Sequence, residues 1–161
     1  MDALILAAAD WLDAIGLGPW ARSGAWVYPV ANTLHLLGLV MLVGGIGILD
    51  LRVLGLWRRL PLAALSRALT PVAVAGLAVI VPTGVVLFAA DGQALAGSAV
   101  FERKLVLILF ALVNAAAFRW IHGSGIDGWG DRAPMSARIM SGLSLLLWLA
   151  IGTLGRWIAY G

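Results

Sequence analysis

The feature that most constrains the fold is a series of four apolar stretches, each about 20 residues long. They cover residues 26–49, 66–89, 99–121 and 137–158. In helical form, at ~1.5 Å per residue, each stretch matches the thickness of the hydrocarbon layer of a bilayer. The connections between them are too short to hold a soluble domain. We therefore predict an all-α integral membrane protein, a four-helix transmembrane bundle that forms a single domain over residues 1–161.

The composition agrees with this class. Hydrophobic residues make up 62% of the chain and charged residues 12%, whereas an average soluble domain has roughly 45–50% and about 25%. The chain has no cysteine, which excludes disulfides, thiolate metal sites and thiol catalysis. Its Lys and Arg residues are scattered at the ends of the apolar stretches and form no basic stripe, so we predict the lipid bilayer as a partner and no nucleic acid.

The positions of the arginines predict the topology. They are concentrated in the first and third connections and at their borders, at Arg52, Arg58, Arg59, Arg67, Arg119, Arg132 and Arg138. The positive-inside rule places these two connections in the cytoplasm and both termini on the periplasmic or outer side. Residues 2–15 are too few to span, and we predict that they form an interfacial helix lying on the outer end of the bundle, ended by Gly16, Gly18 and Pro19.

Polar side chains recur in the outer half of the predicted bundle. His35 lies ~14 Å and Asn32 ~9 Å from the outer end of the first span, with Tyr28 one turn further out on the same face. In the third and fourth spans, Arg103, Lys104 and Arg156 lie at a similar shallow depth. Because ionisable groups in hydrocarbon cost several kcal/mol, such groups normally face the bundle interior and find partners. We predict one shared cofactor-binding site made by Tyr28, Asn32, His35, Arg103, Lys104 and Arg156, with His35 as the metal ligand.

A structural interpretation of the same residues stays open. Arg103 and Lys104 can snorkel to the headgroups, Arg156 can pair with Glu102, and His35 can be a neutral histidine bonded to a neighbouring helix. His122 follows the third span, with an axial gap of ~20 Å from His35, so the two histidines do not make a bis-histidine haem site.

We assign structural roles to the polar residues near the inner, cytoplasmic end of the predicted bundle. We predict an interfacial ion-pair cluster of Asp50, Arg52, Arg119 and Asp131. Asn114, in the middle of the third span, is expected to make an interhelical hydrogen bond. Ser141 and Ser144 belong to a stripe of small residues that indicates close helix packing.

Three segments, "YPVANTLHLLGLVMLVGGIGILDLRVLGL", "FERKLVLILFALVNAAAF" and "GLSLLLWLAIGTLGRWIAY", make the chain resemble an uncharacterised family of small, four-span bacterial inner-membrane proteins. More distantly, the His-Leu-Leu-Gly and Gly-Gly pattern and the later lysine are similar to the copper-resistance D (CopD) membrane domain and to HemJ-type protoporphyrinogen oxidase. These resemblances imply a four-helix core that uses a first-span histidine and, in the HemJ case, b-type haem. Carried over, His35 is the axial ligand and Lys104 assists the haem or porphyrin carboxylates.

Three functions remain open at this point. The first is a haem b redox or electron-transfer protein, with the propionates held by Arg103, Lys104 and Arg156 and with a redox partner in the membrane. The second is a carrier or chaperone for a metal ion or small hydrophobic molecule, in a pocket lined by Tyr28, Asn32 and His35. The third is a structural subunit of a membrane complex or a homo-oligomer. Motifs of classical hydrolases and primary pumps are absent from the sequence, and whether the protein is an enzyme is left open.

Overall fold

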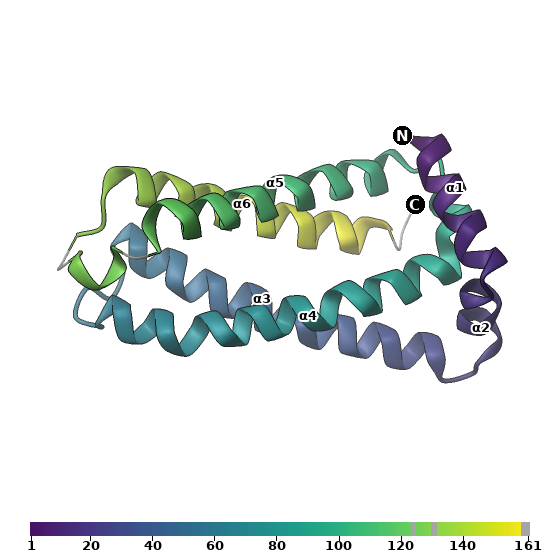
Figure 1. The fold of residues 1–161 in the computed structure, drawn as a ribbon, viewed down its shortest axis with the longest axis horizontal. Coiled ribbons are helices and arrows are strands. Elements are labelled where there is room, and N and C mark those ends of the chain that lie inside the picture. The colour runs from purple at the N-terminus through teal and green to yellow at the C-terminus, as the bar shows by residue number, and fades with distance from the viewer. Residues whose placement is uncertain (124, 130–131, 159–161) are drawn as a thin grey trace.

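The structure of the chain is a computed structural model that describes residues 1–123, 125–129 and 132–158. Within these ranges all regular structure is helical, which confirms the predicted all-α class (Figure 1). The elements are α1 (Asp2–Ala14), α2 (Leu17–Ser23), α3 (Val27–Leu54), α4 (Leu62–Leu95), α5 (Ala99–His122), the short 3₁₀ helix η1 (Ile126–Gly128) and α6 (Met135–Trp157).

The four long helices form two antiparallel pairs. α3 packs most extensively on α4, and α5 packs on α6, while contacts between α3 and α6 join the two pairs. Figure 1 shows α3 and α4 as one layer and α5 and α6 as the other. All four are long and apolar enough to cross a membrane, so the chain has the helices of a multi-pass membrane protein.

The observed helices are longer than the predicted spans at several ends. α3 continues to Leu54 instead of ending at residue 49, and α4 covers Leu62–Leu95 instead of residues 66–89. Hydropathy detects only the part of a helix that suits hydrocarbon, whereas the hydrogen-bonded helix continues into the interface. Pro71 and Pro82 both lie inside α4 and do not end it.

The N-terminal segment differs from the prediction at its end. Gly16 begins a second helix, because its left-handed backbone (φ +85°) turns the chain between α1 and α2. Gly18 and Pro19 lie in the first turn of α2, where a proline is tolerated, and do not terminate a helix. The two helices meet at a bend of 76° and lie across the end of the bundle where α4 passes into α5 (Figure 1).

Small residues bring α3 and α4 into backbone contact. A Cβ added to Gly76 would lie 2.6 Å from the Gly38 carbonyl oxygen, and one added to Gly45 would lie 3.1 Å from the Leu69 carbonyl oxygen. Close backbone approach through glycine is a common basis of helix association in membranes. The α3–α4 pair is therefore the tightest part of the bundle, and the central apolar core is completed by α5 and α6 residues including Ala111, Leu147, Trp148 and Ile151.

Candidate functional site

His35 is held against α4 by a polar contact in the outer half of the bundle. Its Nδ1 lies 3.1 Å from Thr83 Oγ1. The ring packs on the α4 backbone, since a Cβ added to Gly84 would lie 3.2 Å from His35 Cε1. The imidazole therefore faces a neighbouring helix and is half-buried.

The Thr83 hydroxyl fixes the direction of this hydrogen bond. Thr83 Oγ1 lies 2.6 Å from the Val79 carbonyl oxygen and 3.2 Å from that of Ile80, so its single proton is donated to the helix backbone. The hydroxyl oxygen then accepts from His35 Nδ1–H. This leaves Nε2 as the nitrogen with the lone pair, which is the arrangement of a histidine oriented by an outer partner.

Lys104 is the second predicted residue that reaches this region. It acts electrostatically on the His35 ring, and its ammonium group lies along α6, where a Cβ added to Gly155 would be 3.3 Å from Nζ. His35 on α3 and Lys104 on α5 are thus near enough to interact electrostatically, and their shared role in binding a cofactor stays a prediction.

Of the other predicted residues, Tyr28, Asn32 and Arg103 make no hydrogen bond or ion pair with His35 in the described ranges. Tyr28 donates from its hydroxyl to Asp91 Oδ2 at 2.9 Å, at the outer end of the bundle. Asn32 and Arg103 are exposed, and Arg156 is exposed with an interaction of its own. Glu102 pairs with the N-terminal ammonium group at 3.5 Å. Within the described ranges no three His, Cys, Asp or Glu side chains form a group that could hold a metal, so a metal at His35 would need ligands of other types.

His122 lies at the other end of the bundle, where α5 ends. Its Nε2 is 3.3 Å from Ser136 Oγ, and its ring contacts Phe118 and Trp129. The residue is part of the packing between α5, η1 and α6.

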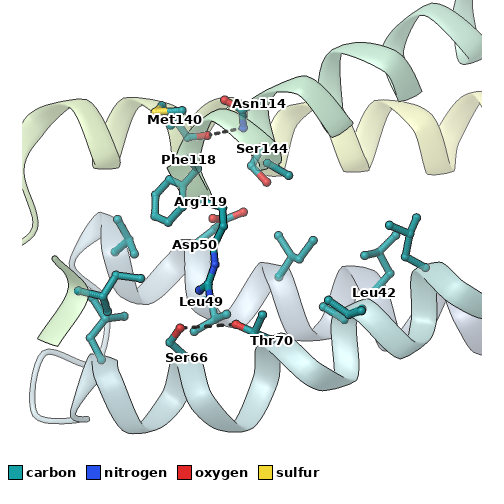
Figure 2. A pocket seen from close by; sticks show the side chains of 18 residues that line it. Leu42, Leu49, Asp50, Ser66, Thr70, Asn114, Phe118, Arg119, Met140 and Ser144 are labelled. Atoms are coloured by element: carbon teal, nitrogen blue, oxygen red, sulfur yellow. Dashed lines mark hydrogen bonds between the residues drawn. The ribbon is translucent and has the colours of Figure 1, made fainter. Parts of the chain in front are cut away.

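A cavity lies at the end of the bundle whose polar residues were predicted to have only structural roles. It has a volume of about 410 Å³ and is lined by residues of α3, α4, α5, η1 and α6. Figure 2 shows 18 lining side chains, most of them apolar, with Asp50, Ser66, Thr70, Asn114, Arg119 and Ser144 as the polar ones. This size is within the usual range of ligand sites, ~300–1,000 Å³, and a few polar groups in an apolar wall are typical of them.

Asp50 is the most unusual group in this cavity. Its side chain projects from α3 and the residue is only 7% exposed. The hydroxyls of Ser141 and Ser144 on α6 flank its carboxyl group, and Figure 2 shows the Ser144 hydroxyl directed toward it. Even so, Asp50 Oδ2 and Ser141 Oγ have no hydrogen-bond partner among the described residues. A buried carboxylate oxygen without a donor is costly, and such groups often mark a binding site.

Among the described residues, the predicted ion pair of Asp50 with Arg52 or Arg119 is wrong. Arg52 is buried but turns away from Asp50 and donates to two carbonyl groups of the α3–α4 connection, from Nε to Leu60 at 2.8 Å and from Nη2 to Arg58 at 3.0 Å. Neither of the ion pairs found in the described ranges includes Asp50 or Arg119. Asp131 lies outside the described residues. The Arg52 guanidinium thus hydrogen-bonds backbone carbonyls of the connection. Neither hydropathy nor residue spacing predicts where those carbonyls lie.

The predicted role of Asn114 is confirmed. Its amide nitrogen donates to the Met140 carbonyl oxygen of α6 at 3.1 Å (Figure 2). The bond ties α5 to α6 at the wall of the cavity.

Sequence reasoning missed the cavity although one signal was present. Asp50 is the only acidic residue between Trp26 and Ala90, at the end of an apolar run, and Ser141 and Ser144 were interpreted only as packing residues. That the α3 carboxylate faces these α6 hydroxyls depends on the contact between α3 and α6, which no spacing within one helix reveals.

The fold and the cavity define a helical membrane bundle with a buried, mostly apolar site. The chain belongs to a family of unknown function, DUF6644, whose model matches residues 9–161. This confirms the prediction of an uncharacterised family, whereas the distant resemblance to the CopD domain and to HemJ stays a prediction. No curated protein and no solved structure matches the chain.

Proposed function

We propose that the protein is an intramembrane carrier or chaperone that binds a small, mostly apolar molecule in the cavity between its two helix pairs. The observation that carries this proposal is a partly open cavity of about 410 Å³ lined by residues of all four membrane-length helices. Well-packed interiors contain few voids larger than a water molecule. A space of this size, lined mainly by aliphatic side chains with one buried carboxyl group, has the character of a binding site.

The position of the cavity suits exchange with the bilayer. It lies near the end that carries the α3–α4 and α5–α6 connections, and its lining residues belong mainly to the last turns of α3 and α5 and the first turns of α4 and α6. An apolar molecule dissolved in the hydrocarbon layer can reach such a site between helices without crossing water.

A cavity-filling variant tests the proposal. Leu77 lines the cavity from α4, whereas Val81, one turn further along the same helix, is 58% exposed and does not line it. With 1-hexanol as a neutral probe and the protein in amphipol, we expect the melting temperature of the wild type to rise with probe concentration. Leu77→Trp should remove this rise, and the matched control Val81→Trp should retain it. Equal responses of the two variants would contradict binding in the cavity.

The second candidate is the binding of haem b through His35. It is favoured by the Thr83 contact, which leaves Nε2 available as an axial ligand. Lys104, together with Arg103 and Arg156, would then hold the propionates, and the haem would supply one-electron chemistry. A visible absorption spectrum of gently solubilised protein tests this candidate: a Soret band that His35→Ala abolishes supports it, and a colourless protein that gains no band with added haem contradicts it.

We also propose that the chain lies in the bacterial inner membrane with both termini in the periplasm. The end of the bundle with the α3–α4 and α5–α6 connections carries Arg58, Arg59 and Arg132, which the positive-inside rule assigns to the cytoplasm. A reporter that is active only in the cytoplasm, inserted after Leu60 or after Gly97, tests the orientation. Activity of the second fusion but not of the first would reverse the proposed topology.

A further inference from the structure

We propose that Asp50 binds an ammonium group, so that the ligand of the cavity is a small amphipathic amine. This inference rests on the proposed function, since it names the chemistry of a ligand in the same cavity. It concerns the polar end of the ligand, whereas the apolar lining accounts for its hydrocarbon part.

The first argument is the state of the Asp50 carboxyl group. The residue is buried in the interior of the bundle, and its Oδ2 atom has no donor among the described residues. A carboxylate oxygen that is removed from water and left without a donor is costly, and the cost is recovered when a cation or a strong donor binds to it. A ligand ammonium group provides both a positive charge and N–H donors.

The second argument is the arrangement around the carboxyl group. Ser141, which is 0% exposed, and Ser144 stand on the α6 side of it. Their hydroxyls are suited to hold the carboxyl group from that side, while Asp50 itself lines the open cavity. The side of the carboxylate that faces the cavity is thus open to a ligand.

The third argument is the shape of the apolar part of the site. From the level of Asp50, aliphatic side chains of α3 and α4 continue along the bundle axis toward Leu42, which Figure 2 shows well apart from the polar group. Ile46 and Leu77 line the cavity over this stretch. A molecule with one charged end and an unbranched hydrocarbon body fits a site that is polar at one level and apolar beyond it.

Arg119 is the charged group that opposes this assignment. Its side chain lines the same cavity from α5, and it is exposed while Asp50 is buried. Charges act more strongly in the low dielectric of a buried position than at a hydrated one. We therefore assign the dominant recognition to Asp50 and expect Arg119 to weaken the binding of a cation.

Three probes of equal chain length separate the possibilities: hexylamine, 1-hexanol and hexanoate. We measure their dissociation constants by ligand-observed NMR with the whole chain in amphipol. Hexylamine should bind at least tenfold more tightly than 1-hexanol, and hexanoate should bind most weakly. Asp50→Asn should reduce the binding of hexylamine at least tenfold, to the level of 1-hexanol, because a buried charge pair loses one partner.

The neutral probe keeps the two proposals distinguishable. If 1-hexanol binds the wild type and Asp50→Asn equally, the Asn variant has kept its fold and its cavity. Under that condition, a preference for hexylamine that survives in Asp50→Asn overturns the ammonium inference but leaves the binding cavity in place. The loss of 1-hexanol binding in Leu77→Trp tests only whether the cavity binds a ligand. It does not test the role of Asp50.

Arg119→Gln provides a second variant that does not alter the carboxyl group. It should tighten hexylamine binding and leave the 1-hexanol constant unchanged. If hexanoate is the tightest ligand of the wild type, and Arg119→Gln abolishes its binding, Arg119 is the anchor and the inference is wrong. The same conclusion follows if Asp50→Asn fails to fold and Arg119→Gln leaves hexylamine binding unchanged or weaker.

Discussion

Gly38 of α3 and Gly76 of α4 face each other so closely that a Cβ on Gly76 would lie 2.6 Å from the Gly38 carbonyl oxygen and 2.7 Å from the Leu42 nitrogen. Both neighbours are backbone atoms, which cannot move aside as a side chain can. Since α3 and α4 form the most extensive helix pair, this contact sets the distance between the two helices that make one wall of the cavity.

We expect Gly76→Ala to destabilise the bundle by about 1–3 kcal/mol, the usual cost of overpacking. The loss outweighs the gain of up to about 1 kcal/mol that alanine brings to a helix interior. The thermal unfolding transition of the protein in detergent measures the effect. Gly44→Ala is the control, because an added Cβ there has no neighbour within 4 Å, and this variant should be neutral or more stable.

The hydrogen bonds of Arg52 lead to a second prediction, about the stability of the α3–α4 connection. It is 4% exposed and bonds two carbonyl groups of that connection. Arg52→Met keeps much of the packing but leaves both carbonyls without this donor, and charged hydrogen bonds of this kind contribute about 1.5–3 kcal/mol each. We expect the unfolding midpoint to fall clearly. Arg59→Met, at an exposed position of the same connection, should change it little, and an equal fall in both variants would argue against the proposed role.

The hydrogen bond between His35 and Thr83 predicts a tautomer. With ¹⁵N-labelled histidine, the NMR shifts of the wild type should report a proton on Nδ1 of His35, because Thr83 Oγ1 already donates to the α4 backbone. Thr83→Val removes the acceptor and should increase the Nε2–H form, while Thr83→Ser should retain the wild-type pattern. His122, which contacts Ser136 instead, is the internal control. A His35 pattern that is the same in the Val variant would show that Thr83 does not orient the ring.

The contacts of Arg22 lead to a prediction about the N-terminal helices α1 and α2. Its guanidinium donates to the Ala89 carbonyl oxygen of α4 at 3.1 Å and to Asp13 of α1 at 2.8 Å. We expect Arg22→Met to increase amide hydrogen exchange over α1 and α2 without changing exchange in α5, because the link from α2 to α4 is lost. Exchange that rises equally in all helices would indicate general destabilisation instead.

Most of the fold was predictable because long apolar runs have few structural solutions in a membrane. The rise of a helix also converts residue number into distance along the bundle, which is why the sequence indicates a histidine within the first long helix, and His35 lies in α3. Helical periodicity placed Asn32 and Tyr28 on the same face of the first span as His35. Periodicity does not say which residues of that face a neighbouring helix covers. α4 covers His35 through Thr83 and Gly84, and Asn32 remains exposed.

The cavity could not be predicted for a related reason. Asp50 was matched with the nearest arginine along the chain, Arg52, but two residues apart on a helix point about 160° away from each other. Arg52 consequently bonds the following turn, and Asp50 faces α6. A partner on a helix some 90 residues later in the chain becomes visible only when the packing of the pairs is known.

The length of α4 has a mechanical consequence for how the protein sits in its bilayer. Leu62–Leu95 has 34 residues and is about 51 Å long, so even at a tilt of about 40° it covers about 39 Å of a hydrocarbon layer that is ~30 Å thick. In such a layer at least one end of the helix must extend beyond the hydrocarbon, and at its C-terminal end Ala9 of α1 and Ala21 of α2 pack near Gly92 and Ala89. The bent pair thus covers this end of α4 and exposes Trp11 and Trp20, and because such rings favour the headgroup layer, anchoring there would set how deeply the bundle is immersed.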